Sequence, residues 1–170
     1  VVHGAGLAES QLLTDLDEDR LRRTLWPKVG GARVLHEVFP VDSLDFLYLT
    51  ASAGTVFGVP GQGAYSAGNA YLDGLARERR RQGGHGASLD WVAWQGEGFG
   101  AEAQVVVEEL ARHGSRPVIP AEAFAAWEYA STLDIAHVVM APMPSTAEEA
   151  SDLSASPVRR TPAKAWEDMS

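Results

Sequence analysis

The chain has 170 residues and a formal net charge of −9, with 14 Lys and Arg against 23 Asp and Glu. This charge repels phosphate backbones and anionic lipids, and no apolar run reaches the roughly 20 residues of a membrane span, so we expect neither nucleic acid nor a membrane as partner. The lack of Cys excludes disulfides, thiolate nucleophiles and Cys-type zinc sites, and the five His lack metal-ligand spacing. We expect one folded, metal-free, cytoplasmic domain.

The N-terminal part of the chain predicts one strand and two helical segments. Residues 1–2 are an apolar pair that runs into a small-residue turn, which is typical of a strand. A helix is predicted to begin near Asp17, whose side chain can cap free backbone amides. Pro27 is expected to kink or restart that helix, because proline lacks a backbone N–H. Apolar spacing returns over residues 29–38 and predicts a second helical segment.

The middle of the chain alternates strand and helix patterns. Residues 44–51 form an almost continuous apolar run, which suits a strand covered on both faces. A loop of small residues, 52–63, precedes helical spacing from Ala64 to Arg81. Residues 87–94 predict another buried strand.

The last part of the chain predicts two helices, over residues 101–113 and 121–133, and a short strand over residues 135–140. Strands that alternate with helices need crossover connections, which predicts an α/β fold: a Rossmann-like parallel sheet with flanking helices. From residue 141 to 170 the composition shifts to Pro, Ser, Ala and charged residues without a period. This shift favours a disordered linker after a domain of residues 1–140.

The expected ligand site lies beyond the carboxyl ends of the predicted strands, where ligands of open α/β sheets bind. These ends are followed by turns at residues 3–7, 52–64 and 94–100. We therefore expect three loops to converge on one site.

Four polar residues are candidates for chemistry at this site: Ser52, Tyr65, Asn69 and Lys28. Tyr65 and Asn69 are four residues apart and so share one helix face. A phenol has an ordinary pKa of about 10; a nearby ammonium lowers that pKa by stabilising the phenolate, and a serine hydroxyl can donate to a substrate oxygen. Taken singly, each residue also has an ordinary structural interpretation, as a boundary tyrosine, a solvated lysine or a turn serine.

The stretch FLYLTASAGTVFGVPGQGAYSAGNAYLDGL, residues 46–75, closely resembles the ketoreductase domains of type I polyketide synthases, a branch of the short-chain dehydrogenase/reductase superfamily. The resemblance extends to VVHGAG, WPKVGGARVLHE, SLDWVAWQGEGFG and RPVIPAEAF and covers residues 1 to 140. In that family a Ser, a Tyr 13 residues later, an Asn four beyond it and a Lys 24 residues before the Ser line the site. Ser52, Tyr65, Asn69 and Lys28 match this spacing.

The resemblance implies a role for each of the four residues. Tyr65 would protonate the carbonyl oxygen of a β-ketoacyl thioester, and Ser52 would help to hold that oxygen. Lys28 would tune Tyr65 and contact the nicotinamide ribose, and Asn69 would support the proton relay. The hydride would come from NADPH, and the resemblance implies a set of cofactor-binding residues: Ala5, Gly6, Lys28, Tyr65, Trp91 and Ala93.

The same resemblance implies partners and a position within a larger synthase. The substrate would be carried by the phosphopantetheine of an acyl carrier protein domain, and residues 141–170 would lead toward that domain beside other synthase domains. The superfamily's nucleotide-binding strands would precede Val1, so the fold would be partial. Two alternatives stay open: a catalytically silent structural fragment that packs on a partner half and tethers a carrier, and a single-domain reductase of small ketones, which the position of Lys28 disfavours.

Overall fold

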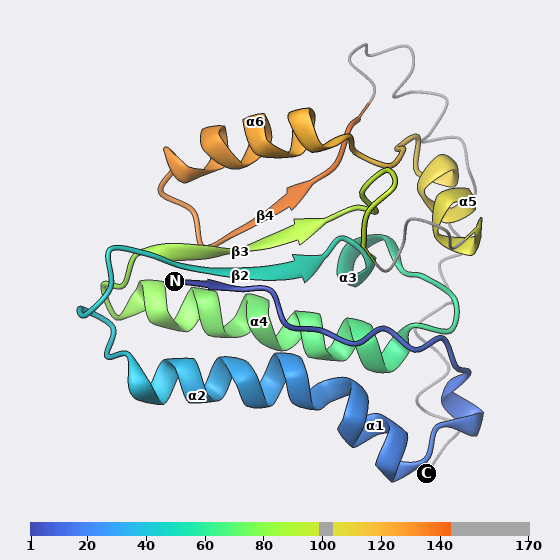
Figure 1. The fold of residues 1–170 in the computed structure, drawn as a ribbon, viewed down its shortest axis with the longest axis horizontal. Coiled ribbons are helices and arrows are strands. Elements are labelled where there is room, and N and C mark those ends of the chain that lie inside the picture. The colour runs from blue at the N-terminus through green and yellow to red at the C-terminus, as the bar shows by residue number, and fades with distance from the viewer. Residues whose placement is uncertain (99–103, 144–170) are drawn as a thin grey trace, which may run out of the picture.

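The computed structural model describes residues 1–98 and 104–143. In these residues four strands form one sheet in the order β1-β2-β3-β4, and every neighbouring pair is parallel. Their carboxyl ends therefore lie at the same end of the sheet, beside α3 and α5 (Figure 1). The predicted α/β fold with a parallel sheet is confirmed. The strands are β1 (Val2–His3), β2 (Leu47–Ser52), β3 (Gly86–Trp91) and β4 (His137–Met140).

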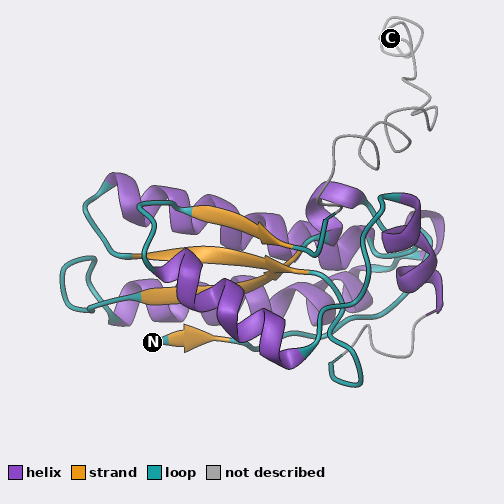
Figure 2. Cartoon of the chain, turned by 90° about the horizontal axis from the view of Figure 1, so that it is seen from above, coloured by secondary structure: helices purple, strands orange, loops and turns teal. Residues whose placement is uncertain are grey.

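Helices cover both faces of the sheet. One face is covered by α4 with α1 and α2, and the other by α6 (Figures 1 and 2). The helices are α1 (Glu18–Leu25), α2 (Gly31–Val38), α3 (Gly54–Phe57), α4 (Gly63–Arg81), α5 (Gln104–Arg112) and α6 (Pro120–Ser131), with a 3-10 turn η1 (Leu13–Asp15) and a π-helical turn η2 (Trp26–Gly30).

The alternation of side chains along β2 and β3 divides the core into two clusters. Leu47, Leu49 and Ala51 of β2 are buried against α4 and α2. Leu89 and Trp91 of β3 point to the other face and pack with residues of α5 and α6. Side chains of β3 are buried on both faces, as expected of a strand inside a parallel sheet.

Several strand boundaries and one loop differ from the sequence prediction, and β4 begins at His137 rather than at residue 135. β2 begins at Leu47 rather than at residue 44, and the predicted loop after it contains the short helix α3. β3 ends at Trp91 rather than at residue 94, because the chain changes pairing partners there. The Val92 N–H donates to the Met140 carbonyl at 3.2 Å, and the Ala93 carbonyl accepts from the Val118 N–H at 2.9 Å.

The first helical region begins near Asp17 and is interrupted at Pro27, as predicted. Asp17 caps α1, because its Oδ1 accepts from the Arg20 N–H at 2.8 Å. Pro27 interrupts the α-helix as predicted: α1 ends at Leu25 and α2 begins at Gly31. Between them Pro27 lies in η2, where the Gly31 N–H reaches back to the Trp26 carbonyl. The wider π turn tolerates a residue that cannot donate and whose ring would crowd an α-helical turn. This turn sets the position of Lys28.

The predicted linker falls almost entirely outside the described residues, and residues 141–143 form no helix or strand. Within the two described ranges, the helices are all too short or too polar to cross a membrane.

A core truncation tests this packing. Leu89 is fully buried in β3, so Leu89→Ala leaves a cavity and is expected to lower the free energy of unfolding by about 2–5 kcal/mol. Val34→Ala, at an exposed position of α2, is the control and should change it by less than about 0.5 kcal/mol. Urea unfolding followed by circular dichroism measures the free energy of unfolding of both variants. Equal midpoints for Leu89→Ala and Val34→Ala would contradict the assigned core.

Candidate active site

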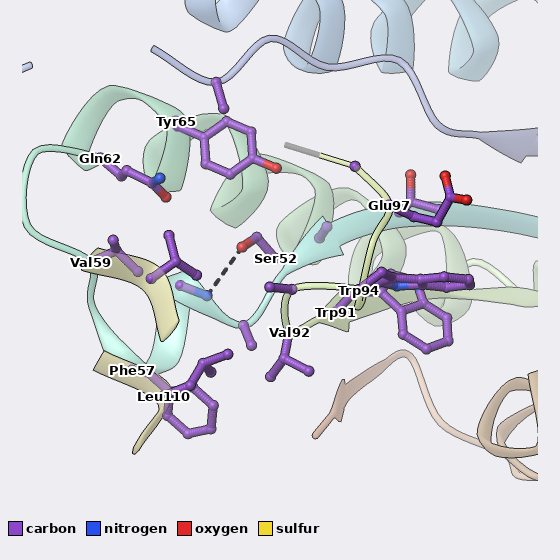
Figure 3. A pocket seen from close by; sticks show the side chains of 18 of the residues that line it. Ser52, Phe57, Val59, Gln62, Tyr65, Trp91, Val92, Trp94, Glu97 and Leu110 are labelled. Atoms are coloured by element: carbon purple, nitrogen blue, oxygen red, sulfur yellow. Dashed lines mark hydrogen bonds between the residues drawn. The ribbon is translucent and has the colours of Figure 1, made fainter. Parts of the chain in front are cut away.

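A cavity of about 440 Å³ lies at the carboxyl ends of β2 and β3. Its polar side chains include Lys28, Ser52 and Tyr65, which come from three different elements. Figure 3 shows apolar side chains from α3, β3, α5 and the loops after α3 and β3 around the same space. Among them are Phe57, Val59, Trp91, Val92, Trp94 and Leu110. The turns predicted to converge after the strands therefore do so.

Lys28 is buried in this site, with 4% of its surface exposed. Its ammonium donates to the Thr50 carbonyl at 2.8 Å and lies 5.6 Å from the centre of the Tyr65 ring. Burial lowers the pKa of Lys28 to about 8, and the charge of Asp90 acts in the opposite direction. The interpretation of Lys28 as a solvated surface charge is therefore wrong.

Tyr65 and Asn69 lie on the first two turns of α4. Burial raises the pKa of the Tyr65 phenol, and hydrogen bonding with the Asn69 and Ser52 side chains lowers it in part. The Asn69 Nδ2 also donates to the Tyr65 carbonyl at 2.8 Å. Asn69 is fully buried, and its Oδ1 has no hydrogen-bond partner among the described residues. The asparagine thus fixes the turn that carries the phenol.

Ser52 is the last residue of β2, and Figure 3 shows its hydroxyl beside the Tyr65 ring. The Ser52 Oγ accepts from the Gly54 N–H at 3.2 Å, at the start of α3. Accepting this bond leaves the hydroxyl hydrogen free to be donated. The sharp passage from β2 into α3 therefore aims the serine at the cavity.

The predicted cofactor residues differ in their positions. Trp91 and Ala93 line the cavity, as Lys28 and Tyr65 do. In the loop after β1, Ala5 is exposed and Gly6 is half-buried, whereas the neighbouring Gly4 and Ala8 line the cavity. The assignment of Ala5 and Gly6 to the cofactor stays a prediction.

The sequence analysis missed the polar residues behind the cavity. Asp90 is fully buried in β3, and its Oδ2 accepts from the Thr55 hydroxyl at 2.7 Å and contacts the His137 Nε2 at 3.0 Å. Burial raises the pKa of Asp90 to about 6. A carboxylate inside an apolar strand pattern is the signal that would have found it, because buried acids are almost always paired.

Lys28, Ser52 and Tyr65 thus line one cavity, with a buried ammonium beside a phenol, and Asn69 lies next to Tyr65 in the core. Residues 1–96 match the model of the KR domain family. The chain belongs to the ketoreductase (KR) domain family of polyketide synthases. It is 52% identical over 169 residues to a phenolphthiocerol/phthiocerol polyketide synthase of Mycobacterium tuberculosis, covering 99% of this chain and 9% of that protein. It is 48% identical over 128 residues to 6-methylsalicylic acid synthase of Aspergillus niger, covering 75% of this chain and 7% of that protein.

Solved ketoreductases have the same fold. PlmKR1, the ketoreductase from the first module of phoslactomycin biosynthesis in Streptomyces sp. HK803, superposes with a TM-score of 0.74 at 34% identity, covering 84% of this chain and 33% of that one. An A-type ketoreductase from a modular polyketide synthase superposes with a TM-score of 0.79 at 29% identity, covering 89% and 36%. The resemblance to a ketoreductase is thus confirmed, within a superfamily of oxidoreductases that use nicotinamide cofactors. The KR chain spans about a third of these solved chains.

The buried lysine predicts how stability depends on pH. The folded Lys28 loses its proton near pH 8, whereas an unfolded lysine keeps it to 10.5. Between these values the unfolded chain binds more protons, so the free energy of unfolding should rise with pH by on the order of 3 kcal/mol. This rise should disappear in Lys28→Met and persist in Arg33→Met, which removes an exposed cation. Urea unfolding at pH 7.5 to 10.5 measures it, and parallel curves for the wild type and Lys28→Met would refute the burial of the ammonium.

Proposed function

We propose that this KR chain supplies the catalytic residues of an NADPH-dependent β-ketoacyl reductase, which reduces a carrier-bound thioester during polyketide synthesis. The observation that supports it best is the position of the Lys28 ammonium, buried against the Tyr65 ring at a cavity that Ser52 also lines. A phenol placed beside a cation and a hydroxyl is suited to deliver a proton to a carbonyl oxygen.

Each residue has a defined task in this reaction. Ser52 donates a hydrogen bond to the ketone oxygen and orients it toward the phenol. As negative charge develops on that oxygen, the Tyr65 hydroxyl transfers its proton and the product becomes an alcohol. Lys28 stabilises the phenolate that remains, and burial strengthens this attraction because the site has a low dielectric constant. Asn69 keeps the Tyr65 backbone in place.

The described residues fit the nicotinamide end of NADPH, which supplies the hydride when bound. Lys28 has three N–H donors, and Thr50 accepts the only hydrogen bond that this ammonium donates within the described residues. The remaining donors suit ribose hydroxyls. Trp91 and Ala93 line the same cavity and suit a flat ring. The predicted contacts of Ala5 and Gly6 would extend this surface along the loop after β1.

The proposal includes a division of labour within a cytoplasmic synthase. The solved ketoreductase PlmKR1 is about three times as long as the segment that this chain covers. The nucleotide-binding strands would come from that remainder, residues 1–140 would form the catalytic part, and residues 141–170 would lead to an acyl carrier protein domain whose phosphopantetheine holds the substrate.

The competing proposal is a silent segment that packs on a partner half and tethers a carrier. The two differ in one assay: NADPH oxidation by the complete ketoreductase domain with a β-ketoacyl thioester. Turnover that depends on this chain favours the reductase. Stoichiometric binding of the partner half without turnover would favour the structural role.

The proton donor provides the sharpest prediction. In the complete domain, Tyr65→Phe should lower kcat by about 10²- to 10⁴-fold, because it removes a general acid while keeping the ring. The affinity for NADPH should stay near the wild-type value. Stopped-flow absorbance of NADPH measures kcat, and fluorescence titration measures the affinity for NADPH.

The matched control is Tyr71→Phe, which removes a phenol from the exposed side of the same helix. It should keep full turnover. A loss in Tyr65→Phe no larger than in Tyr71→Phe would remove Tyr65 from the acid role.

A further inference from the structure

Asp90 is a charged residue in the middle of the sheet, next to the catalytic cavity. It is fully buried, and it directly precedes Trp91, which lines the cavity. An uncompensated carboxylate in such a place is strongly unfavourable. The buried Asp90 carboxylate therefore needs hydrogen-bond partners, and His137 and Thr55 provide them.

The first partner, His137 of β4, is held in one tautomer. The Arg77 guanidinium lies 3.3 Å from the His137 Nδ1. Because a guanidinium only donates, this nitrogen accepts and the proton is on Nε2. The Nε2–H then donates to the Asp90 Oδ2 at 3.0 Å. The His137 ring thus joins Arg77 to the Asp90 carboxylate, and with both ring nitrogens engaged it has no lone pair to offer a metal ion.

The second partner, Thr55 of α3, connects Asp90 to the catalytic serine. The Thr55 Oγ1 lies 2.7 Å from the Asp90 Oδ2 and 2.9 Å from the Ser52 carbonyl. The next residue back, Gly54, donates its N–H to the Ser52 Oγ. Asp90 therefore ties the end of β2 and the first turn of α3 to β3.

Charge also links Asp90 to Lys28. Burial of the ammonium lowers the pKa of Lys28, and the negative charge of Asp90 raises it. Two further ionisable groups interact with Asp90. Its charge raises the pKa of the Tyr65 phenol. Asp73 of α4 accepts from the Ser88 hydroxyl at 2.6 Å and lies 3.8 Å from the His137 Nε2. Asp73 raises the pKa of Asp90, whereas His137 and Thr55 lower it.

We propose that Asp90 is a positioning residue of the reductase: its carboxylate, fixed by Thr55 and His137, holds the turn that aims Ser52. This inference rests on the proposed function and extends it to residues behind the cavity. It assigns to Arg77 and His137 the task of keeping Asp90 ionised.

Asp90→Asn in the complete domain tests the proposal, because it keeps the shape and removes the charge. We expect kcat to fall at least about tenfold, the size expected when a charge-assisted hydrogen bond is lost, with KM little changed. The alkaline limb of the kcat profile should move to lower pH, because the charge of Asp90 raises the pKa of both Lys28 and Tyr65. The acid limb near pH 6, where Asp90 takes up its proton, should disappear.

The matched control is Asp73→Asn, which removes a buried carboxylate that neither Thr55 nor Lys28 contacts. It should keep kcat and the alkaline limb. If Asp90→Asn misfolds, two variants of Thr55 test the same link. Thr55→Val should lower kcat about tenfold, because it removes the hydroxyl. Thr55→Ser keeps a hydroxyl and should keep kcat near the wild-type value. An unchanged pH profile and kcat in Asp90→Asn, or equal kcat in both Thr55 variants, overturns the proposal.

One measurement separates this inference from the proposed function. Hydrogen exchange of the Gly54 N–H, which donates to the Ser52 Oγ, reports the turn without any catalysis. In Asp90→Asn this exchange should be faster than in the wild type, even if the wild-type domain proves inactive as a reductase. An unchanged exchange rate overturns the tie between Asp90 and the turn.

Discussion

The free-energy cost of burying the Lys28 ammonium is the constraint on which the site depends. Water solvates an ammonium far better than a protein interior does, so a buried lysine needs compensating groups. Here these are the Thr50 carbonyl, the face of the Tyr65 ring and the charge of Asp90. Each belongs to a different element, so the sheet, η2 and α4 must all be in place before the lysine is tolerated.

In the proposed reaction, the same burial prepares the site for proton transfer. Water is largely excluded from Lys28, so its attraction to a phenolate at Tyr65 is stronger than it would be at the surface. In the neutral resting state burial raises the pKa of Tyr65, which keeps its proton in place. The ammonium then favours release only when the phenol faces an acceptor that gains negative charge. This combination suits a general acid better than a permanently ionised tyrosine.

The sequence predicts local structure, but it does not show contacts between residues that are far apart in the chain. Apolar runs indicate the strands, and the spacing of Tyr65 and Asn69 places both on one helix face, because these patterns follow from backbone periodicity. The pairing of Lys28 with Tyr65 was available only through the family resemblance, since it depends on how η2 packs on α4. The end of β3 and the role of Asp90 were missed because they depend on Val118 and His137, which lie far along the chain from β3.

Titration of Lys28 itself tests the central claim most directly. Selective ¹³C labelling of lysine, with assignment by Lys28→Met, allows the Lys28 ε-carbon signal to be followed by NMR from pH 6 to 11. A buried ammonium beside Tyr65 predicts a midpoint of about 8, moved further down in Asp90→Asn. A midpoint of 10.5, the value of a solvated lysine, would contradict both the burial and the catalytic role derived from it.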